Sequence, residues 1–316
     1  MTDRLRIVQV GDVAHVAPAI ADALAPHADV FNVPLRQVAA RLSGPVKVLT
    51  APMRIADAMR VARDVRRLRP DVVHVHWVPN GVIGPMVRRP WVLHAHGDDI
   101  RDLNVWRRLA FAPLIRAADA VVVSTPDLVD FAPAGAAFVP TPIPRLGGTR
   151  RPELWDVLVI SAARDEKGSP VAFDALRRLA VRRPGLRMAA HDGPAYEEGP
   201  WERLAPTSKL EFQGRLAAAR VVLGQFAIGA LGIADLESMA LGRPLLTWLR
   251  EGLYPDPPPL FSSRDPEELA ERAVALLDSD AERETIGSAG ADWVRRTHAP
   301  DAIAAQLLAI YRRLLG

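Results

Sequence analysis

A glycine-rich turn leading into a short helix is the segment best suited to bind an anion. The apolar run 221–223 ends at Gly224, and Gly229 and Gly232 follow before a helical pattern that closes at Gly242. Backbone N–H groups at a helix N-terminus have no partner within the helix and attract phosphate. The sequence therefore predicts an anion site at this turn.

Glu237 lies about one turn inside that helix, where its carboxylate could accept hydrogen bonds from two adjacent ribose hydroxyls. The alternative is a solvated surface acid. Met239, Ala240 and the glycine exit at Gly242 indicate a helix that packs closely in the interior. A buried carboxylate with a binding role is the interpretation we favour.

A second anion site is predicted after the expected strand 155–161. Arg164 and Lys167 follow that strand and precede a helix start at Ser169 and Pro170, with Ser169 as the expected cap. A guanidinium, an ammonium and free backbone N–H groups would together neutralise a diphosphate. Ordinary solvated loop charges are the equally weighted alternative.

Four histidines alternate along two neighbouring strands, so that His74 and His76 share one face of the first, and His94 and His96 one face of the second. Four imidazoles could hold a metal, although strand pleat alone produces this spacing. We favour His96, which ends its strand, as a polar contact or acid–base group. His74 and His94 fit hydrogen-bonded core histidines better.

Gly11 ends the first strand and would let a ligand approach the backbone, although a plain turn is equally consistent. A Gly-x-Gly-x-x-Gly loop is missing here, because positions 13 and 16 are valine, and this disfavours a nicotinamide-dependent dehydrogenase. Asp98 and Asp99 could be a metal-binding pair. We favour Asp99 as the cap of the following helix.

Composition removes several classes of protein. The 316 residues include no cysteine, which excludes zinc fingers, iron–sulfur sites and cysteine nucleophiles. No stretch reads as a signal peptide or a spanning helix, so we expect a soluble, cytoplasmic protein.

The net charge of +3 conceals an uneven distribution: residues 1–150 carry 19 basic and 13 acidic side chains, and the remainder 21 and 24. The densest basic segment, 54–69, reads as an amphipathic helix. Contact with an anionic membrane surface is one interpretation, and a solvated arginine-rich face is the other. No aromatic residue lies among these arginines, so nucleic acid is not an expected partner.

Short β-branched runs alternate with helical patterns in both halves, which is typical of the α/β class with doubly wound parallel sheets. We expect strands at 4–10, 28–33, 71–77, 90–96, 120–124, 136–139, 155–161, 186–190, 209–212, 220–223 and 243–249. The proline-rich stretch 140–152 reads as a linker. Two Rossmann-like domains, 1–145 and 146–300, would face each other across a ligand-binding cleft. The final helix, 301–316, packs either on its own domain or back on the first.

Three segments together are similar to the retaining GT-B glycosyltransferases of the family-4 type. Segment 232–244, GIADLESMALGRP, resembles the family's Gly-Leu-x-x-x-Glu-Ala-Met-Ala-x-Gly-x-Pro motif. Segments 71–76, DVVHVH, and 94–100, HAHGDDI, resemble its first-domain segments. Arg164 and Lys167 resemble its Arg/Lys pair, two residues closer together than usual.

The resemblance implies site residues with distinct roles. Arg164 and Lys167 would hold a diphosphate, Glu237 a ribose, the backbone at Gly232 and Ile233 the phosphates, and His96 the transferred sugar. A nucleotide diphosphate sugar would be the co-substrate, with neither a metal nor a further cofactor, and an acceptor hydroxyl would receive the sugar with retention. A nucleotide-sugar epimerase, a phosphorylase-like enzyme and a non-catalytic nucleotide-binding homologue are the alternatives.

Two departures from the family pattern bear on the donor sugar and the first loop. The family's paired glutamates are eight positions apart, and the earlier one falls on Gly229 in this chain. The double-glycine loop after the first strand is reduced to Gly11 and Asp12. The chain is also short for the family.

Overall fold

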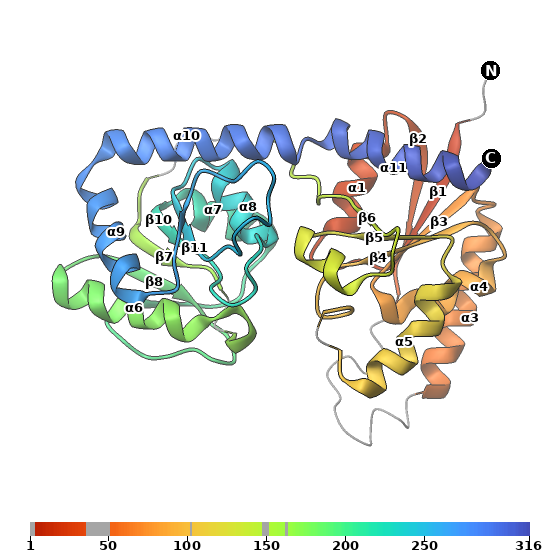
Figure 1. The fold of residues 1–316 in the computed structure, drawn as a ribbon, viewed down its shortest axis with the longest axis horizontal. Coiled ribbons are helices and arrows are strands. Elements are labelled where there is room, and N and C mark those ends of the chain that lie inside the picture. The colour runs from red at the N-terminus through yellow and green to blue at the C-terminus, as the bar shows by residue number, and fades with distance from the viewer. Residues whose placement is uncertain (1–3, 36–50, 102, 147–151, 162–163) are drawn as a thin grey trace. The chain divides into compact units, whose positions relative to one another are not determined.

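The structure is a computed structural model that describes residues 4–35, 51–101, 103–146, 152–161 and 164–316 (Figure 1). The chain divides into two compact units. Unit 1 comprises Met1–Pro142 with Pro300–Gly316, and unit 2 comprises Ile143–Ala299. Each contains a six-stranded sheet in which every paired strand is parallel. The expected α/β class with two Rossmann-like domains is confirmed.

The sheet of unit 1 has the order β2-β1-β3-β4-β5-β6. Its strands are β1 (Leu5–Val10), β2 (Ala28–Val33), β3 (Val72–His76), β4 (Trp91–Ala95), β5 (Ala120–Val123) and β6 (Ala137–Phe138). The chain runs from β1 to β2 on one side and then starts β3 on the other, so the strand order reverses between β1 and β3.

Helices cover both faces of this sheet. Helices α3 (Ala51–Arg67), α4 (Gly84–Val87) and α5 (Val105–Ala117) lie on one side, while α1 (Val16–Leu24) and α11 (Pro300–Leu315) lie side by side on the other (Figure 1). Valines of β1 and β3 pack against the buried side of α3, in a cluster that includes Val8, Val10, Val73, Val75, Val61 and Val65. Because strand side chains alternate, the intervening polar residues face the α1 and α11 layer.

The sheet of unit 2 has the order β12-β11-β10-β7-β8-β9. Its strands are β7 (Trp155–Val159), β8 (Met188–His191), β9 (Glu202–Leu204), β10 (Ala219–Leu223), β11 (Leu245–Thr247) and β12 (Phe261–Ser262). The strand order reverses between β7 and β10. Both of these strands are almost wholly buried, as expected for a parallel sheet covered on both faces.

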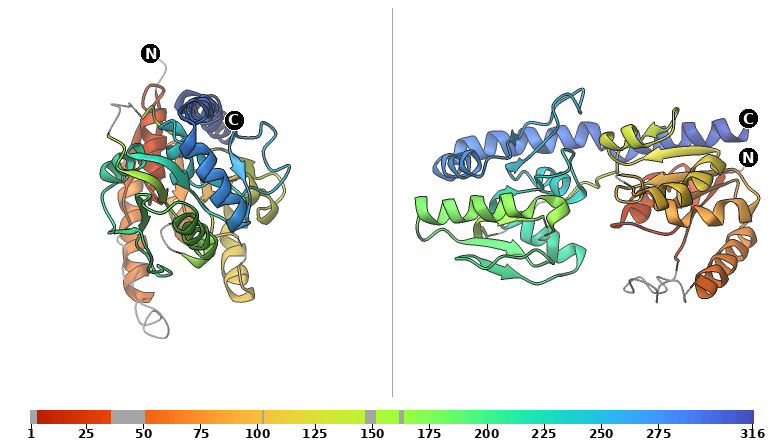
Figure 2. Two further views of the ribbon diagram at one scale, coloured as in Figure 1. Left: turned by 90° about the vertical axis from the view of Figure 1, so that its left-hand side faces the viewer. Right: turned by 60° about the horizontal axis from the view of Figure 1, so that its bottom comes forward.

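Alternate residues of β7 and β10 enter two separate cores. Val157 and Leu223 pack with α6 (Ser169–Arg182) and α9 (Pro266–Asp278), whereas Leu158 and Val222 pack with the helices of the opposite face. Those helices are α7 (Lys209–Ala217), α8 (Ile233–Ala240) and α10 (Asp280–Thr297), and Figure 2 gives two further views of both layers.

The structure corrects two local predictions in unit 2. The expected strand 209–212 is the start of α7, because Ser208 caps that helix by accepting a hydrogen bond from the Glu211 N–H. Ser169 is not a cap but the first residue of α6, whose cap is Gly168. The short strands β9 and β12 were not predicted.

Two further predictions concern the linker and membrane-spanning helices. Within the expected linker 140–152, residues 147–151 lie outside the described residues. Among the helices that the structure describes, none is long and apolar enough to span a bilayer.

Candidate functional site

Several of the predicted site residues follow the two strands that flank each reversal of strand order, whereas His96 follows β4 and Glu237 lies within α8. In unit 2, Arg164 and Lys167 come after β7, and the glycine turn that ends at Gly232 comes after β10. In unit 1, Gly11 follows β1 and the loop after β3 lies next to it. Loops beyond the carboxyl ends of strands at such a reversal diverge and leave room for a ligand.

The two loops of unit 2 are joined through the backbone. The Phe226 N–H donates to the Lys167 carbonyl oxygen at 2.7 Å. Gly168 has φ +76°, and a Cβ there would lie 2.8 Å from the carbonyl carbon of Phe226. Only glycine allows the loop after β7 to approach the loop after β10 this closely.

The two predicted cations differ in exposure: the Arg164 side chain is exposed and Lys167 is half-buried. Lys167 lies close enough to Asp235 of α8 for its positive charge to favour the ionised carboxylate. Burial has the larger effect and raises the pKa of Asp235 to about 6. The loop after β7 therefore brings a cation to the first turn of α8.

Part of the N-terminus of α8 is capped from within the helix. The Gly232 N–H donates to Asp235 Oδ2 at 2.8 Å, and a Cβ on Gly224 would lie 2.3 Å from Asp235 Oδ1. The Gly232 amide is therefore already engaged by a carboxylate. Ile233 follows as the first residue of the helix.

Glu237 is 2% exposed and faces α7. Its Oε1 atom lies 2.6 Å from Lys209 Nζ and accepts a hydrogen bond from Gln213 Nε2 at 2.8 Å. Its Oε2 atom is buried and has no hydrogen-bond partner among the described residues. An unpaired buried carboxylate oxygen is costly, and a ligand hydroxyl would satisfy it.

Gly229 occupies a left-handed backbone conformation with φ +79°. A Cβ there would lie 2.6 Å from the ring of Trp248, which in turn stacks with the Arg264 guanidinium, 3.3 Å from the ring centroid. The space for a glutamate at this position is therefore taken by an indole ring.

Gly11 of unit 1 also has a left-handed backbone, with φ +78°. A Cβ there would lie 2.9 Å from Asn80 Nδ2, and Asn80 itself donates to the His76 carbonyl oxygen at 2.7 Å. Its neighbour Asp12 is near enough to raise the pKa of His96, against the larger effect of burial. The first loop and His96 thus lie close together.

The four histidines form two hydrogen-bonded pairs across β3 and β4. His74 Nε2 lies 3.0 Å from His94 Nδ1, and His76 Nδ1 lies 3.0 Å from His96 Nε2. Beyond the pairs, His74 Nδ1 lies 2.6 Å from the hydroxyl of Tyr311 on α11. Burial lowers the pKa of His74 to about 3 and of His96 to about 4, and it lowers those of His76 and His94 well below 6.5. All four rings are neutral at pH 7.

One nitrogen from each of His74, His76 and His94 lies within 4.8 Å of the others, close enough for a metal site. Both ring nitrogens of His74 and His76 already form hydrogen bonds. A metal bound by all three residues would have to replace some of these bonds, so the geometry favours hydrogen-bonded chains.

Asp99 is not the helix cap that the sequence predicts. Its Oδ1 accepts from the N–H groups of His96 and Gly97, at 2.9 and 2.8 Å, and its Oδ2 accepts from the Val78 N–H at 2.9 Å. The cap of α5 is Asn104. Asp99 instead fastens the loop after β4 to the loop after β3.

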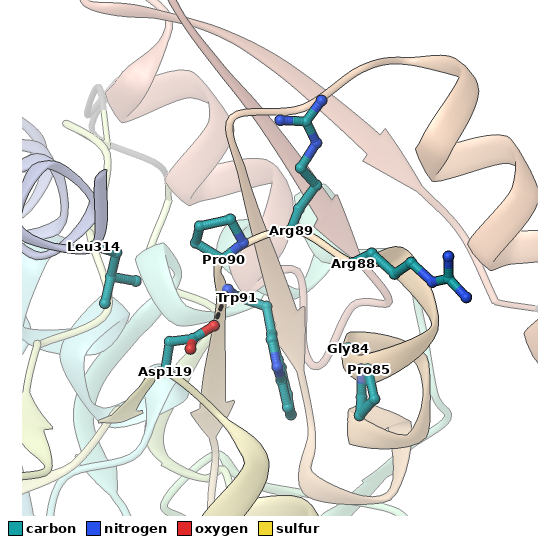
Figure 3. Close-up of a pocket in the computed structure, with 8 residues that line it drawn as sticks. All are labelled: Gly84, Pro85, Arg88, Arg89, Pro90, Trp91, Asp119 and Leu314. Atoms are coloured by element: carbon teal, nitrogen blue, oxygen red, sulfur yellow. Dashed lines mark hydrogen bonds between the residues drawn. The ribbon is translucent and has the colours of Figure 1, made fainter. Parts of the chain in front are cut away.

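A pocket of about 420 Å³ lies at the amino-terminal ends of β4 and β5 in unit 1 (Figure 3). Trp91 begins β4 beside it, and its N–H donates to Asp119 Oδ2 at 2.9 Å. This is the amino end of the strand, whereas His96 follows its carboxyl end. The pocket and the predicted site are therefore separate.

Sequence reasoning missed the side chains that orient the predicted residues. Lys209 and Gln213 hold Glu237, and Gln9 holds His76. One signal was available for Lys209: the chain has only three lysines, and Lys167 and Lys209 are two of them.

The sequence matches no family model and no curated protein, whereas solved structures share its fold. HepE from Anabaena, in complex with UDP and glucose, has a TM-score of 0.71 at 15% identity, over 97% of this chain and 99% of that one. A sucrose-phosphate synthase from Thermosynechococcus elongatus has 0.68 at 16%, over 98% and 99%. A mutant O-GlcNAc transferase from Thermobaculum terrenum has 0.58 at 16%, over 99% and 68%. Through this likeness the chain is shown to have the GT-B fold.

Proposed function

We propose that the chain is a glycosyltransferase that moves a sugar from a nucleoside diphosphate sugar to an acceptor hydroxyl. The observation that carries the proposal is the buried carboxylate of Glu237, with one oxygen held by Lys209 and Gln213 and the other unpaired. A ribose offers two adjacent hydroxyls as donors to such a carboxylate. The sequence of α8 around Glu237 also carries the most specific part of the family resemblance.

Arg164 and Lys167 are the proposed partners of the diphosphate. They would stabilise the negative charge that grows on the leaving group, worth about 3–4 kcal/mol for a well-placed donor. We propose that transfer occurs with retention and needs no metal, and that His96 contacts the transferred sugar. Gly229, within the glycine turn, and Ile233, the first residue of α8, would face the donor.

The neighbours in fold support this choice of donor. HepE was solved with UDP and with UDP-glucose, and two further neighbours are named as a sucrose-phosphate synthase and an O-GlcNAc transferase. UDP is therefore the first nucleotide to test.

Calorimetric titration with a panel of nucleoside diphosphates tests the binding half of the proposal. We expect one of them to bind, and Glu237→Gln to weaken it by about 10- to 100-fold, because a hydrogen bond to a charged group is worth about 1.5–3 kcal/mol. Glu284→Gln, on the exposed side of α10, is the matched control and should bind as the unaltered protein does. Equal affinities for both variants would remove Glu237 from the site.

Product analysis tests the chemistry. With a donor and an acceptor hydroxyl, we expect a product of unchanged anomeric configuration, formed equally in the presence of a chelator. Altered donor without acceptor would indicate an epimerase, and phosphate-dependent cleavage a phosphorylase-like enzyme. Binding without turnover would favour a non-catalytic homologue, the alternative suggested by Gly229 and the indole of Trp248 that fills the space beside it.

We further propose that unit 1 contacts anionic membrane surfaces at the cytoplasmic side. A groove of about 1070 Å³ runs between α3 and α4. It is lined by Arg60, Arg63, Arg66 and Arg67 of α3 and by Arg88, which directly follows α4. Met59 and Met86 also line it and are 60% and 36% exposed. Cations beside exposed apolar side chains match lipid headgroups above acyl chains.

A further inference from the structure

Gln9 is held in one orientation in the interior of unit 1. Its Nε2 donates to the Ala17 carbonyl oxygen at 2.9 Å and to Asn32 Oδ1 at 3.1 Å. A backbone carbonyl oxygen can only accept a hydrogen bond, so the NH2 end of the amide must face Ala17. The Oε1 end therefore faces His76, 2.8 Å from its Nε2.

This orientation dictates which nitrogen of His76 carries the proton. Gln9 Oε1 can only accept, so the proton of His76 is on Nε2. A neutral imidazole has one N–H, which makes His76 Nδ1 an acceptor. His96 Nε2, 3.0 Å away, must then be the donor. The remaining nitrogen of His96, Nδ1, is left with a lone pair.

His76 and His96 have these tautomers only if both rings are neutral, and their surroundings keep them neutral near pH 7. Burial and the neighbouring imidazoles hold the pKa of His76 well below its usual range. The backbone of His96 is also fixed, since its N–H donates to buried Asp99 at 2.9 Å.

The tautomers of the second pair, His74 and His94, are not fixed by their hydrogen bonds. Tyr311 can either donate to His74 Nδ1 or accept from it, and His94 Nε2 is buried without a hydrogen-bond partner among the described residues. Both proton arrangements of the His74–His94 pair are therefore allowed. Only the pair that ends at His96 has a fixed direction.

We propose that Gln9 and His76 are positioning residues that hold His96 in its Nε2–H tautomer, so that Nδ1 accepts a hydrogen bond from a substrate hydroxyl. A phosphate or carbonyl oxygen has no hydrogen to donate and does not fit this acceptor. A sugar or acceptor hydroxyl does. The choice of a hydroxyl rests on the proposed function, whereas the tautomer follows from the hydrogen bonds alone.

Long-range 1H–15N correlation spectra of the ligand-free, 15N-labelled protein read the tautomers directly. We expect both His76 and His96 to show a protonated Nε2 and an unprotonated Nδ1. A protonated Nδ1 on His96 would overturn the proposal, and this measurement needs no variant.

The variant Gln9→Met removes the acceptor at similar volume, and we expect it to release His96 into a mixture of tautomers. Tyr311→Phe, which alters only the undirected pair, is the control and should leave His96 unchanged. Backbone amide spectra establish that each variant is folded. A folded Gln9→Met protein with an unchanged His96 would refute the role of Gln9.

Kinetics test the hydroxyl contact separately. In a transfer assay Gln9→Met should lower kcat by about two- to tenfold, the range expected for one neutral hydrogen bond, with the KM of the nucleotide unchanged. A fall in nucleotide affinity instead would contradict the assignment. If no nucleotide sugar reacts, the proposed function fails while the tautomer result stands.

Discussion

Lys167 is the residue whose removal most directly tests the diphosphate contact. Lys167→Ala should weaken binding of a nucleoside diphosphate by about 10-fold or more but leave the corresponding nucleoside unaffected, since only the diphosphate carries charge. Paired titrations with UDP and uridine measure this difference. Arg182→Ala, an exposed cation on α6 that pairs with Glu267 and Glu271, is the charge-matched control. An equal loss for UDP and uridine would assign Lys167 a structural role instead.

For single residues, the sequence predicted which side chains have a special role better than it predicted their hydrogen-bond partners. Glu237 could be singled out because it lies one turn inside a helix that follows a glycine-rich turn. Met239, Ala240 and Gly242 indicate that this helix packs in the interior, where a solvated acid is not expected. The misassigned cap at Asp99 shows the limit: its three partners come from two strand ends, and nothing local distinguishes such a tie from an N-cap. Gln9 was invisible for the same reason.

Strands β3 and β4 make the stability of unit 1 depend on pH, because they place four neutral imidazoles in its interior. An unfolded histidine titrates near pH 6.5, whereas the pKa of His74 is lowered to about 3 and that of His96 to about 4 by burial. Below pH 6.5 the unfolded chain binds more protons, so the stabilisation is full above 6.5 and is lost as pH falls towards 4. For each such histidine, the free energy of unfolding falls by about 1.4 kcal/mol for every pH unit below 6.5, until the pKa of the folded state is reached.

Amide hydrogen exchange in β3 and β4 at pH 7, 6 and 5 measures this loss, after correction for the intrinsic exchange rate. Asp235 of unit 2 should behave in the opposite way. Its pKa is raised to about 6, so the folded state binds its proton more readily than the unfolded chain, and its contribution to stability increases as pH falls. Protection of β3 and β4 that stays constant from pH 7 to 5 would contradict the assignment of four neutral rings.

The elements that were predicted well are those with a strong local pattern. The β-branched runs of β1, β3 and β10 are buried on both faces, and this alone marks them as strands of a parallel sheet. The start of α7 failed because Lys209–Phe212 alternates polar and apolar residues, which fits a strand until Ser208 is recognised as a cap. The docking of α11 was left open, since Tyr311 and His74 lie 237 residues apart.

The architecture of the whole molecule was predictable because it follows from repetition of one pattern. In each unit the strand order reverses next to the first strand, β1 in one and β7 in the other. The loop after that strand carries Gly11 in unit 1 and Arg164 and Lys167 in unit 2. Parallel strands place all such loops at one edge of a sheet. Side-chain contacts between distant segments, such as His74 with Tyr311, leave no local pattern in the sequence.

The uneven charge of the molecule predicts how it meets a lipid surface. The chain should sediment with vesicles that contain an anionic lipid and remain in solution with neutral ones, because the arginines of the α3 and α4 groove attract negative headgroups at about 1 kcal/mol each. Arg63→Glu with Arg66→Glu should reduce binding more than tenfold, and raised salt should act in the same direction. The matched control is Arg295→Glu with Arg296→Glu on α10 of unit 2, which reverses the same charge at residues that do not line the groove. Equal losses for both double variants would mean that net charge, and not the groove with its exposed Met59 and Met86, is what the membrane recognises.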